Sequence, residues 1–142
     1  MPIRANRFAL LLCLLLIALA AGCASTSGDR IQLESSLFRY AGAIRFNSVD
    51  VAYQYVDPKL RESKPMRALD FERYAQIQFT GYTVRTSETP VPGELRQTVE
   101  VRLINIHTQV ERVMTVQEHW RWDAEARRWW LTSGLPDITP KG

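Results

Sequence analysis

The chain has 142 residues, with 18 Lys and Arg against 15 Asp and Glu, so its formal net charge is +3 at pH 7. No dense run or stripe of basic residues accompanies this small excess, which argues against a nucleic-acid-binding function. The two cysteines and two histidines have neither the spacing of a metal site nor the number that a disulfide framework needs, and we expect no cofactor.

The chain opens with a segment that has the layout of a secretory signal peptide. Arg4 and Arg7 form a positively charged start, and residues 8–21 are an uninterrupted apolar run of 14 residues. A retained transmembrane helix needs about 20 apolar residues, so a cleaved leader fits this run better. Residues 1–22 are therefore predicted to be the leader, and its loss would lower the net charge to +1.

The stretch Leu19-Ala20-Ala21-Gly22-Cys23 that ends the apolar run resembles the lipobox of bacterial lipoproteins. The resemblance implies that Cys23 accepts a diacylglyceryl group, and two or more acyl chains hold a protein stably on a membrane. Because Ala24 and not Asp follows the cysteine, it also implies a Gram-negative outer-membrane address, with the domain facing the periplasm. The alternative is an ordinary secreted protein in which Cys23 is a free terminal thiol.

The first part of the mature chain is predicted to be a short polar tether followed by helices. Residues 23–30 form the lipidated cysteine and its tether, and residues 31–136 form one domain, with a loose tail at 137–142. Apolar residues recur at helical spacing from residue 31 to 44, which predicts an amphipathic helix. The inward stripe consists of Leu33, Leu37, Tyr40, Ala41 and Ile44.

A second, shorter helix is predicted to begin at Asn47, which has Asp50 three residues later, as expected of an N-cap and an acidic first turn. It would carry residues 51, 52, 55 and 56 inward and end at Asp57-Pro58, because a residue before proline is disfavoured in a helix. Residues 59–64 are charged and predicted to be a loop. Residues 66–74 are predicted to form one or two further helical turns.

The apolar spacing changes to the alternation of strands near residue 75. A first strand would run from residue 77 with a bulge or bend at Gly81, and a turn at 90–93 would lead to a second strand at 95–103. A turn at 105–109, which contains His107, precedes a third strand at 110–122, and a polar hairpin loop at 123–127 leads to a fourth strand at 128–133. The tryptophans all lie in this last hairpin, where cross-strand contacts predict a rigid element: Trp120, Trp122, Trp129 and Trp130.

Two N-terminal helices, the helix end Val56-Asp57-Pro58 and a meander that closes with Trp120-Arg121-Trp122-Asp123 and Arg128-Trp129-Trp130-Leu131 resemble the NTF2-like, or cystatin-like, α+β cone. The resemblance covers roughly residues 31–135. It implies helices packed on a curved antiparallel meander of about four strands, with a pocket at the open end and, in many cones, dimerisation through the sheet. Members include isomerases, dehydratases and hydrolases as well as proteins that only bind ligands or partners, so the fold does not settle the function.

The inward face of the third strand supplies the candidate site residues. It places Arg112 and Glu118 among apolar residues, and a carboxylate in such surroundings has a raised pKa that suits a general base. Glu118, with Arg112 near the mouth and with Trp120 and Trp122, is therefore predicted to line a pocket. The alternative is that a bulge shifts the register, or that Arg112 and Glu118 face water at the sheet edges. His119 would point to the opposite face.

Two functions remain open, and we assign no catalytic residue. A non-catalytic outer-membrane lipoprotein that docks an envelope protein predicts an exposed apolar patch and no deep polar pocket. A small-ligand-binding or enzymatic cone predicts a closed apolar pocket of several hundred Å³, on the order typical of ligand sites, with one or two convergent polar groups. The first function is favoured because the sequence contains no Ser/His/Asp set, P-loop or metal-ligand spacing.

Overall fold

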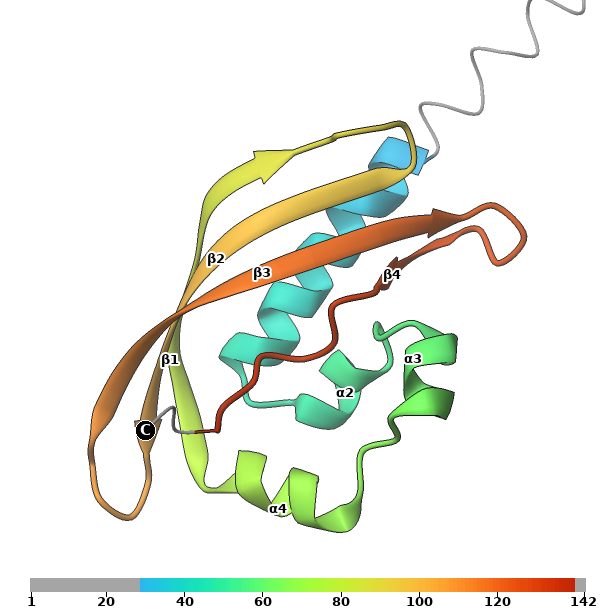
Figure 1. Cartoon of the computed structure of the whole chain (residues 1–142). Coiled ribbons are helices and arrows are strands. Elements are labelled where there is room, and N and C mark those ends of the chain that lie inside the picture. The colour runs from blue at the N-terminus through green and yellow to red at the C-terminus, as the bar shows by residue number, and fades with distance from the viewer. Residues whose placement is uncertain (1–28, 140–142) are drawn as a thin grey trace, which may run out of the picture.

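A computed structural model describes residues 29–139, and in it helices lie against one face of a curved antiparallel sheet (Figure 1). The sheet is a meander with strand order β1-β2-β3-β4, which confirms the α+β class and the four antiparallel strands. The leader and Cys23 lie outside the described residues. After an N-terminal helix that covers residues 29–45, the elements are α2 (Val49–Tyr53), α3 (Pro58–Ser63), α4 (Ala68–Ala75), β1 (Ile77–Glu88), β2 (Glu94–Asn105), β3 (Glu111–Asp123) and β4 (Arg128–Leu131).

The N-terminal helix packs the predicted apolar stripe against the sheet. Tyr40 and Ile44 are completely buried, and Leu33 and Leu37 are half-buried against the same core. Asp29 and Arg30, which were expected in the tether, are already helical. The indole nitrogen of Trp129 donates to the carbonyl oxygen of Asp29 at 2.9 Å, so the start of the described helix is tied to β4.

Asn47 does not cap the second helix, which corrects the prediction. It ends the first helix with a φ of 55°, a left-handed conformation that asparagine tolerates better than most residues. Its side-chain oxygen accepts a hydrogen bond from the backbone N–H of Phe79 at 2.8 Å, so Asn47 joins the helix end to β1. The short α2 begins at Val49 without a side-chain cap, and Val51, expected to point inward, is 40% exposed.

The charged stretch after Asp57 is a helix and not the predicted loop. Asp57 is the N-cap of α3, its side chain accepts from the backbone N–H of Lys59 at 2.9 Å, and Pro58 occupies the first helical position. Aspartate at the cap and proline directly after it are a known start signal. The predicted turns at 66–74 are confirmed as α4.

The predicted strand alternation is confirmed. The register of β1 against β2 shifts between Phe79 and Gly81, where a bulge was expected, and shifts again between Val84 and Thr86. Four inward residues of β2 are at most 5% exposed: Leu95, Val99, Val101 and Leu103. The exposed side chains of the outer sheet face are largely polar, with Glu100 accepting hydrogen bonds from Arg85 and Arg102.

The last hairpin has the predicted tryptophan pairing. Trp122 lies directly opposite Trp129, with ring centroids 5.8 Å apart, and the guanidinium of Arg128 lies 3.9 Å from the ring centroid of Trp130. The fourth strand ends at Leu131, earlier than expected. Leu131 also pairs in parallel with Val56, which joins the helical segment to the edge of the sheet.

The segment after β4 is not the loose tail that we expected at residues 137–139. It runs back across the domain past α2 (Figure 1), and Ile138 packs against the core. The hydroxyl of Tyr74 donates to the carbonyl oxygen of Pro136, and the guanidinium of Arg112 donates to that of Ile138, both at 2.6 Å. This segment forms one wall of the cleft described below.

Candidate functional site

Glu118 lies in the interior of the domain, on the inward face of β3 as predicted. Its side chain has no exposed surface. The hydroxyl of Tyr82, from β1, lies 2.8 Å from both carboxylate oxygens, and the indole nitrogen of Trp120 donates to one of them at 3.3 Å. The bulge at Gly81 allows this contact, because it changes which residues of β1 face inward.

The surroundings of Glu118 bring the pKa of its carboxyl close to neutral pH. Burial raises the pKa of Glu118 to about 7, although the hydrogen bonds from Tyr82 and Trp120 act in the opposite direction. Burial and the neighbouring Glu118 carboxylate together raise the pKa of Tyr82, so Tyr82 stays a hydrogen-bond donor. Glu118 therefore has the chemistry of a general base, but a substrate cannot reach it in this conformation.

The four candidate residues share a strand face but do not meet at one site. Arg112 lies near the far end of β3, where its guanidinium is bonded to the chain after β4 and borders a recess with Ile77 and Asn105. Trp120 is 1% exposed and its ring packs edge-on against Tyr40, with centroids 5.2 Å apart. Trp122 pairs with Trp129 in the hairpin. Glu118 and Arg112 thus do not form the predicted pocket pair.

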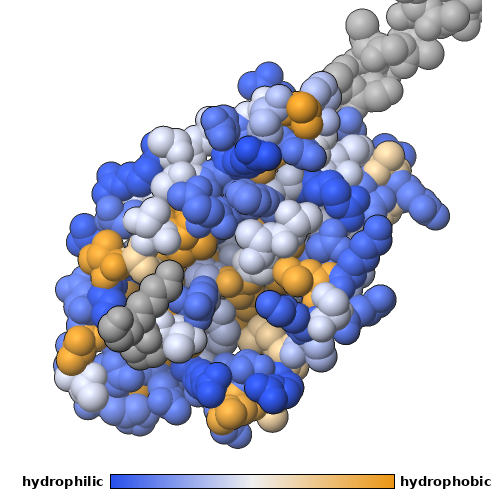
Figure 2. Space-filling view, viewed as in Figure 1, coloured by the Kyte–Doolittle hydropathy of each residue, from blue (hydrophilic) through white to orange (hydrophobic). Residues whose placement is uncertain are grey.

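A cleft of about 320 Å³ lies elsewhere, between the short helices and the segment after β4. In Figure 2 apolar residues gather around a hollow near the middle of this face, with polar residues around them. The segments around the cleft are distant in the sequence, and each of them contributes apolar residues to the lining. These residues are Tyr53, Val56, Leu60, Met66, Tyr74, Leu135 and Ile138.

Charged residues of both signs also line this cleft, and they come mainly from α4 and from the segment that precedes it. Lys64, Asp70, Arg73 and Asp137 line it together with the apolar residues. The carboxylate of Asp70 accepts from the backbone N–H of Arg67 at 2.9 Å and lies 3.5 Å from the guanidinium of Arg73. The hydroxyl of Tyr53 accepts from the backbone N–H of Met66 at 3.1 Å, which fixes the loop before α4. The arrangement can hold an apolar group among charges of either sign.

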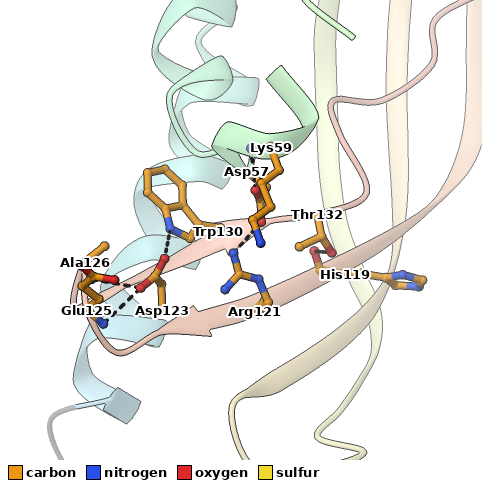
Figure 3. Close-up of polar contacts among 9 residues, drawn as sticks. All are labelled: Asp57, Lys59, His119, Arg121, Asp123, Glu125, Ala126, Trp130 and Thr132. Atoms are coloured by element: carbon orange, nitrogen blue, oxygen red, sulfur yellow. Dashed lines mark hydrogen bonds and ion pairs between the residues drawn. The ribbon is translucent and has the colours of Figure 1, made fainter. Parts of the chain in front are cut away.

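Asp57 joins α3 to the sheet beside this cleft (Figure 3). Asp57 as a whole is 5% exposed. Its carboxylate accepts a hydrogen bond from the guanidinium of Arg121 at 2.7 Å, in addition to capping α3. Burial alone would raise the pKa of Asp57, but the bonds from Arg121 and the Lys59 N–H outweigh it and lower this pKa. His119 points away from the pair in Figure 3 and is exposed, as expected.

We predict that replacing Asp57 by alanine lowers the free energy of unfolding by about 1–3 kcal/mol, because it removes a helix cap and the buried carboxylate of an ion pair. Arg121 is partly exposed, so solvent screens the charge left behind and limits the loss. Asp57→Asn keeps the cap acceptor and should recover about half. Urea denaturation at pH 7 measures both, and equal stability of the alanine variant and the native chain would contradict the prediction.

The cleft and the Asp57–Arg121 pair were missed by the sequence reasoning. The signal for Asp57 was present, because Asp-Pro is also a helix start, but it was interpreted as a helix end. The cleft left no local signal, since it is assembled from residues of α2, α3, α4 and the C-terminal segment.

Among residues 29–139 no group of three or more His, Cys, Asp or Glu side chains could hold a metal ion. Within the same residues no helix has both the length and the apolar character needed to cross a bilayer.

The comparisons with known proteins give a likeness of fold. No family model matches the chain, and no curated protein matches it. Among solved structures, it is similar to the solution structure of a SEC-C motif containing protein from Rhodopseudomonas palustris, with a TM-score of 0.53 and 14% sequence identity. The match covers 68% of this chain and 71% of that one. At this identity the likeness shows the fold alone.

Proposed function

We propose that the protein is a lipoprotein, anchored through acyl chains on Cys23 to the periplasmic face of the outer membrane, whose domain binds a protein partner of the cell envelope. The observation that carries the anchor is the stretch Leu19-Ala20-Ala21-Gly22-Cys23 at the end of an apolar run. The cleft beside α4 is the proposed binding site.

The composition of the cleft supports a protein partner. Protein interfaces place apolar and aromatic side chains at the centre and polar groups around them. Tyr53, Leu60 and Met66 offer apolar contacts, while Lys64 and Asp70 offer charges of opposite sign nearby. A peptide segment carries apolar side chains, backbone donors and acceptors, and charges of either sign, so it matches such a lining.

A homodimer through the sheet is the less favoured mode of association. The outer sheet face carries the charged network of Arg85, Glu100 and Arg102, and charged residues are depleted at the centre of stable interfaces. We also propose that the domain is an NTF2-like cone. The α+β arrangement and the four-stranded meander support this assignment.

The alternative function is a small-ligand-binding or enzymatic pocket, and one observation favours it. A volume of about 320 Å³ lies within the range of about 300–1,000 Å³ that small-molecule sites occupy. The ligand would combine an apolar body with a charged or polar end, because the lining offers both.

The test is affinity purification of the tagged, lipidated protein from gently solubilised envelopes, beside three variants. Cys23→Ala removes the acyl acceptor, Met66→Arg fills the cleft with charge, and Val113→Arg places the same charge on the outer sheet face, where Val113 is 57% exposed. We expect an envelope partner with the native chain and with Val113→Arg, and its loss with Met66→Arg and with Cys23→Ala.

Mass spectrometry of the N-terminal peptide decides the anchor separately, because an acylated Cys23 has a defined mass increase. A partner that is retained by Met66→Arg would place the interface outside the cleft. If no variant and no native sample yields a partner, while native mass spectrometry shows a small molecule lost on Met66→Arg, the alternative function replaces the first.

A further inference from the structure

The outer face of the N-terminal helix exposes large apolar side chains that the fold does not need. Ile31 is 67% exposed, Phe38 79% and Phe46 83%. Isolated exposed apolar residues are ordinary on protein surfaces. Packing within the described domain does not explain two phenylalanines this exposed, one on the helix and one directly after its end.

These three side chains fall on one face of the helix. Ile31 and Phe38 are seven residues apart, which is close to two full turns. Phe46 follows the helix end, but its backbone N–H donates to the carbonyl oxygen of Gly42 at 3.0 Å, so it keeps the helical spacing. Ser35 and Gly42 lie between them on the same face, and the small serine side chain and the absence of a side chain at Gly42 leave the phenylalanines protruding.

Basic residues flank this apolar face. The exposed charged residues of the helix are Arg30, Arg39 and Arg45 against Glu34. Arg30 and Glu34 lie 3.9 Å apart, with both side chains largely exposed, and the guanidinium of Arg45 donates to the carbonyl oxygen of Tyr82 at 2.9 Å. An apolar stripe with phenylalanine, bordered by an excess of arginine, has the pattern of a helix that lies in a membrane interface.

The place of this helix in the chain identifies what covers the stripe. Only residues 24–28 separate Cys23 from the start of the described helix, and five residues span at most about 18 Å in any conformation. A helix over residues 29–45 is about 25 Å long. An acylated Cys23 would hold the start of this helix close to the bilayer and so allow the helix to lie along the surface.

We propose that the outer face of the N-terminal helix lies in the boundary between headgroups and acyl chains of the membrane that holds Cys23, with Phe38 and Phe46 inserted. The inference rests on the proposed lipidation of Cys23. Arginine side chains beside the stripe contact lipid phosphates. The lipid anchor and the helix together determine the orientation of the domain as well as its location, because a helix lying on the bilayer cannot rotate freely about its tether.

Fluorescence quenching in vesicles of phosphatidylethanolamine and phosphatidylglycerol tests this orientation. In the mature lipidated protein an introduced cysteine is the only free thiol, so Ser35→Cys carries an environment-sensitive label on the helix face. Thr115→Cys carries it on the outer face of β3 as a control. The label at residue 35 should be quenched by spin-labelled lipids and protected from aqueous iodide, and the label at residue 115 should behave in the opposite way.

Replacing both Phe38 and Phe46 by serine should remove most of the lipid quenching at residue 35, while the acylated protein still floats with the vesicles. The matched control, Val110→Ser with Val113→Ser, replaces exposed apolar residues of β3 and the turn before it and should change nothing.

A label at residue 35 that iodide quenches as fully as at residue 115, in vesicle-bound acylated protein, would overturn the inference alone. Protection from iodide without lipid quenching would also overturn it, since a second copy or another protein then covers the face. An N-terminal peptide without acyl mass would overturn the anchor and the inference together.

Discussion

Replacing Trp120 by alanine is expected to lower the free energy of unfolding by about 3–5 kcal/mol, as for other large aromatic residues removed from a core. Trp120 is 1% exposed. Its ring lies 5.2 Å from that of Tyr40 and 6.3 Å from that of Tyr55, in edge-on packing. The substitution removes these contacts, leaves a cavity between the N-terminal helix and β3, and takes one hydrogen-bond donor from Glu118.

Urea denaturation followed by circular dichroism measures this loss without relying on tryptophan fluorescence. Trp122→Ala is the matched control, because Trp122 lies two residues away on the same face but is only half-buried. We expect the control to lose clearly less stability. Equal losses at the two positions would mean that the hairpin, and not the contact of β3 with the helix, determines the stability.

The long elements could be predicted because each buries only one face. A helix with one inward stripe and strands with one inward face produce repeats of about 3.6 and 2 residues, and these repeats located Tyr40, Ile44, Val99 and Leu103 in the core. The bulge at Gly81 was predicted for a related reason, since glycine inside a strand pattern is a recurrent mark of irregularity.

The helix α3 could not be predicted in the same way. It contains no fully buried residue, so it imposes no strong apolar period on the sequence. In the sequence, only Asp57 and Pro58 indicate the start of α3, and both residue types also occur where helices end. Asn47 has the same ambiguity, because asparagine occurs at N-caps and at the left-handed position after a helix.

The candidate site was predicted in part. The strand alternation placed Glu118 on the inward face, and this is where it lies. Its partner Tyr82 could not be identified, because it belongs to a strand whose register shifts twice. The cleft is lined by residues as far apart in the sequence as Tyr53 and Thr139, and no local pattern encodes such contacts.

The stability of the domain is expected to fall as the pH rises from about 4.5 to about 7, and to be nearly constant above that range. The pKa of Glu118 is about 7 in the folded protein against an ordinary value of 4.5, so between these values the folded chain binds more protons than the unfolded one. The free energy of unfolding therefore decreases with pH in this window. A difference of this size corresponds to roughly 2–4 kcal/mol.

Glu118→Gln is the direct test of this assignment. The amide is neutral at all of these pH values and keeps an oxygen that accepts from Tyr82. We expect urea denaturation of this variant to show little dependence on pH from 4.5 to 8, and greater stability than the native chain at pH 8. A native chain and a glutamine variant with the same pH dependence would exclude Glu118 as the origin.

The variant Tyr82→Phe separates the effect of this hydrogen bond on the pKa of Glu118 from the effect of burial. The hydroxyl of Tyr82 donates to the ionised carboxylate and so lowers the pKa of Glu118 against the effect of burial. Without this donor the pKa of Glu118 rises further, and the pH range over which stability is lost extends upward. A shift of that range to lower pH would mean that Tyr82 stabilises the protonated acid, and that the network around Glu118 favours the neutral form through hydrogen bonding as well as through burial.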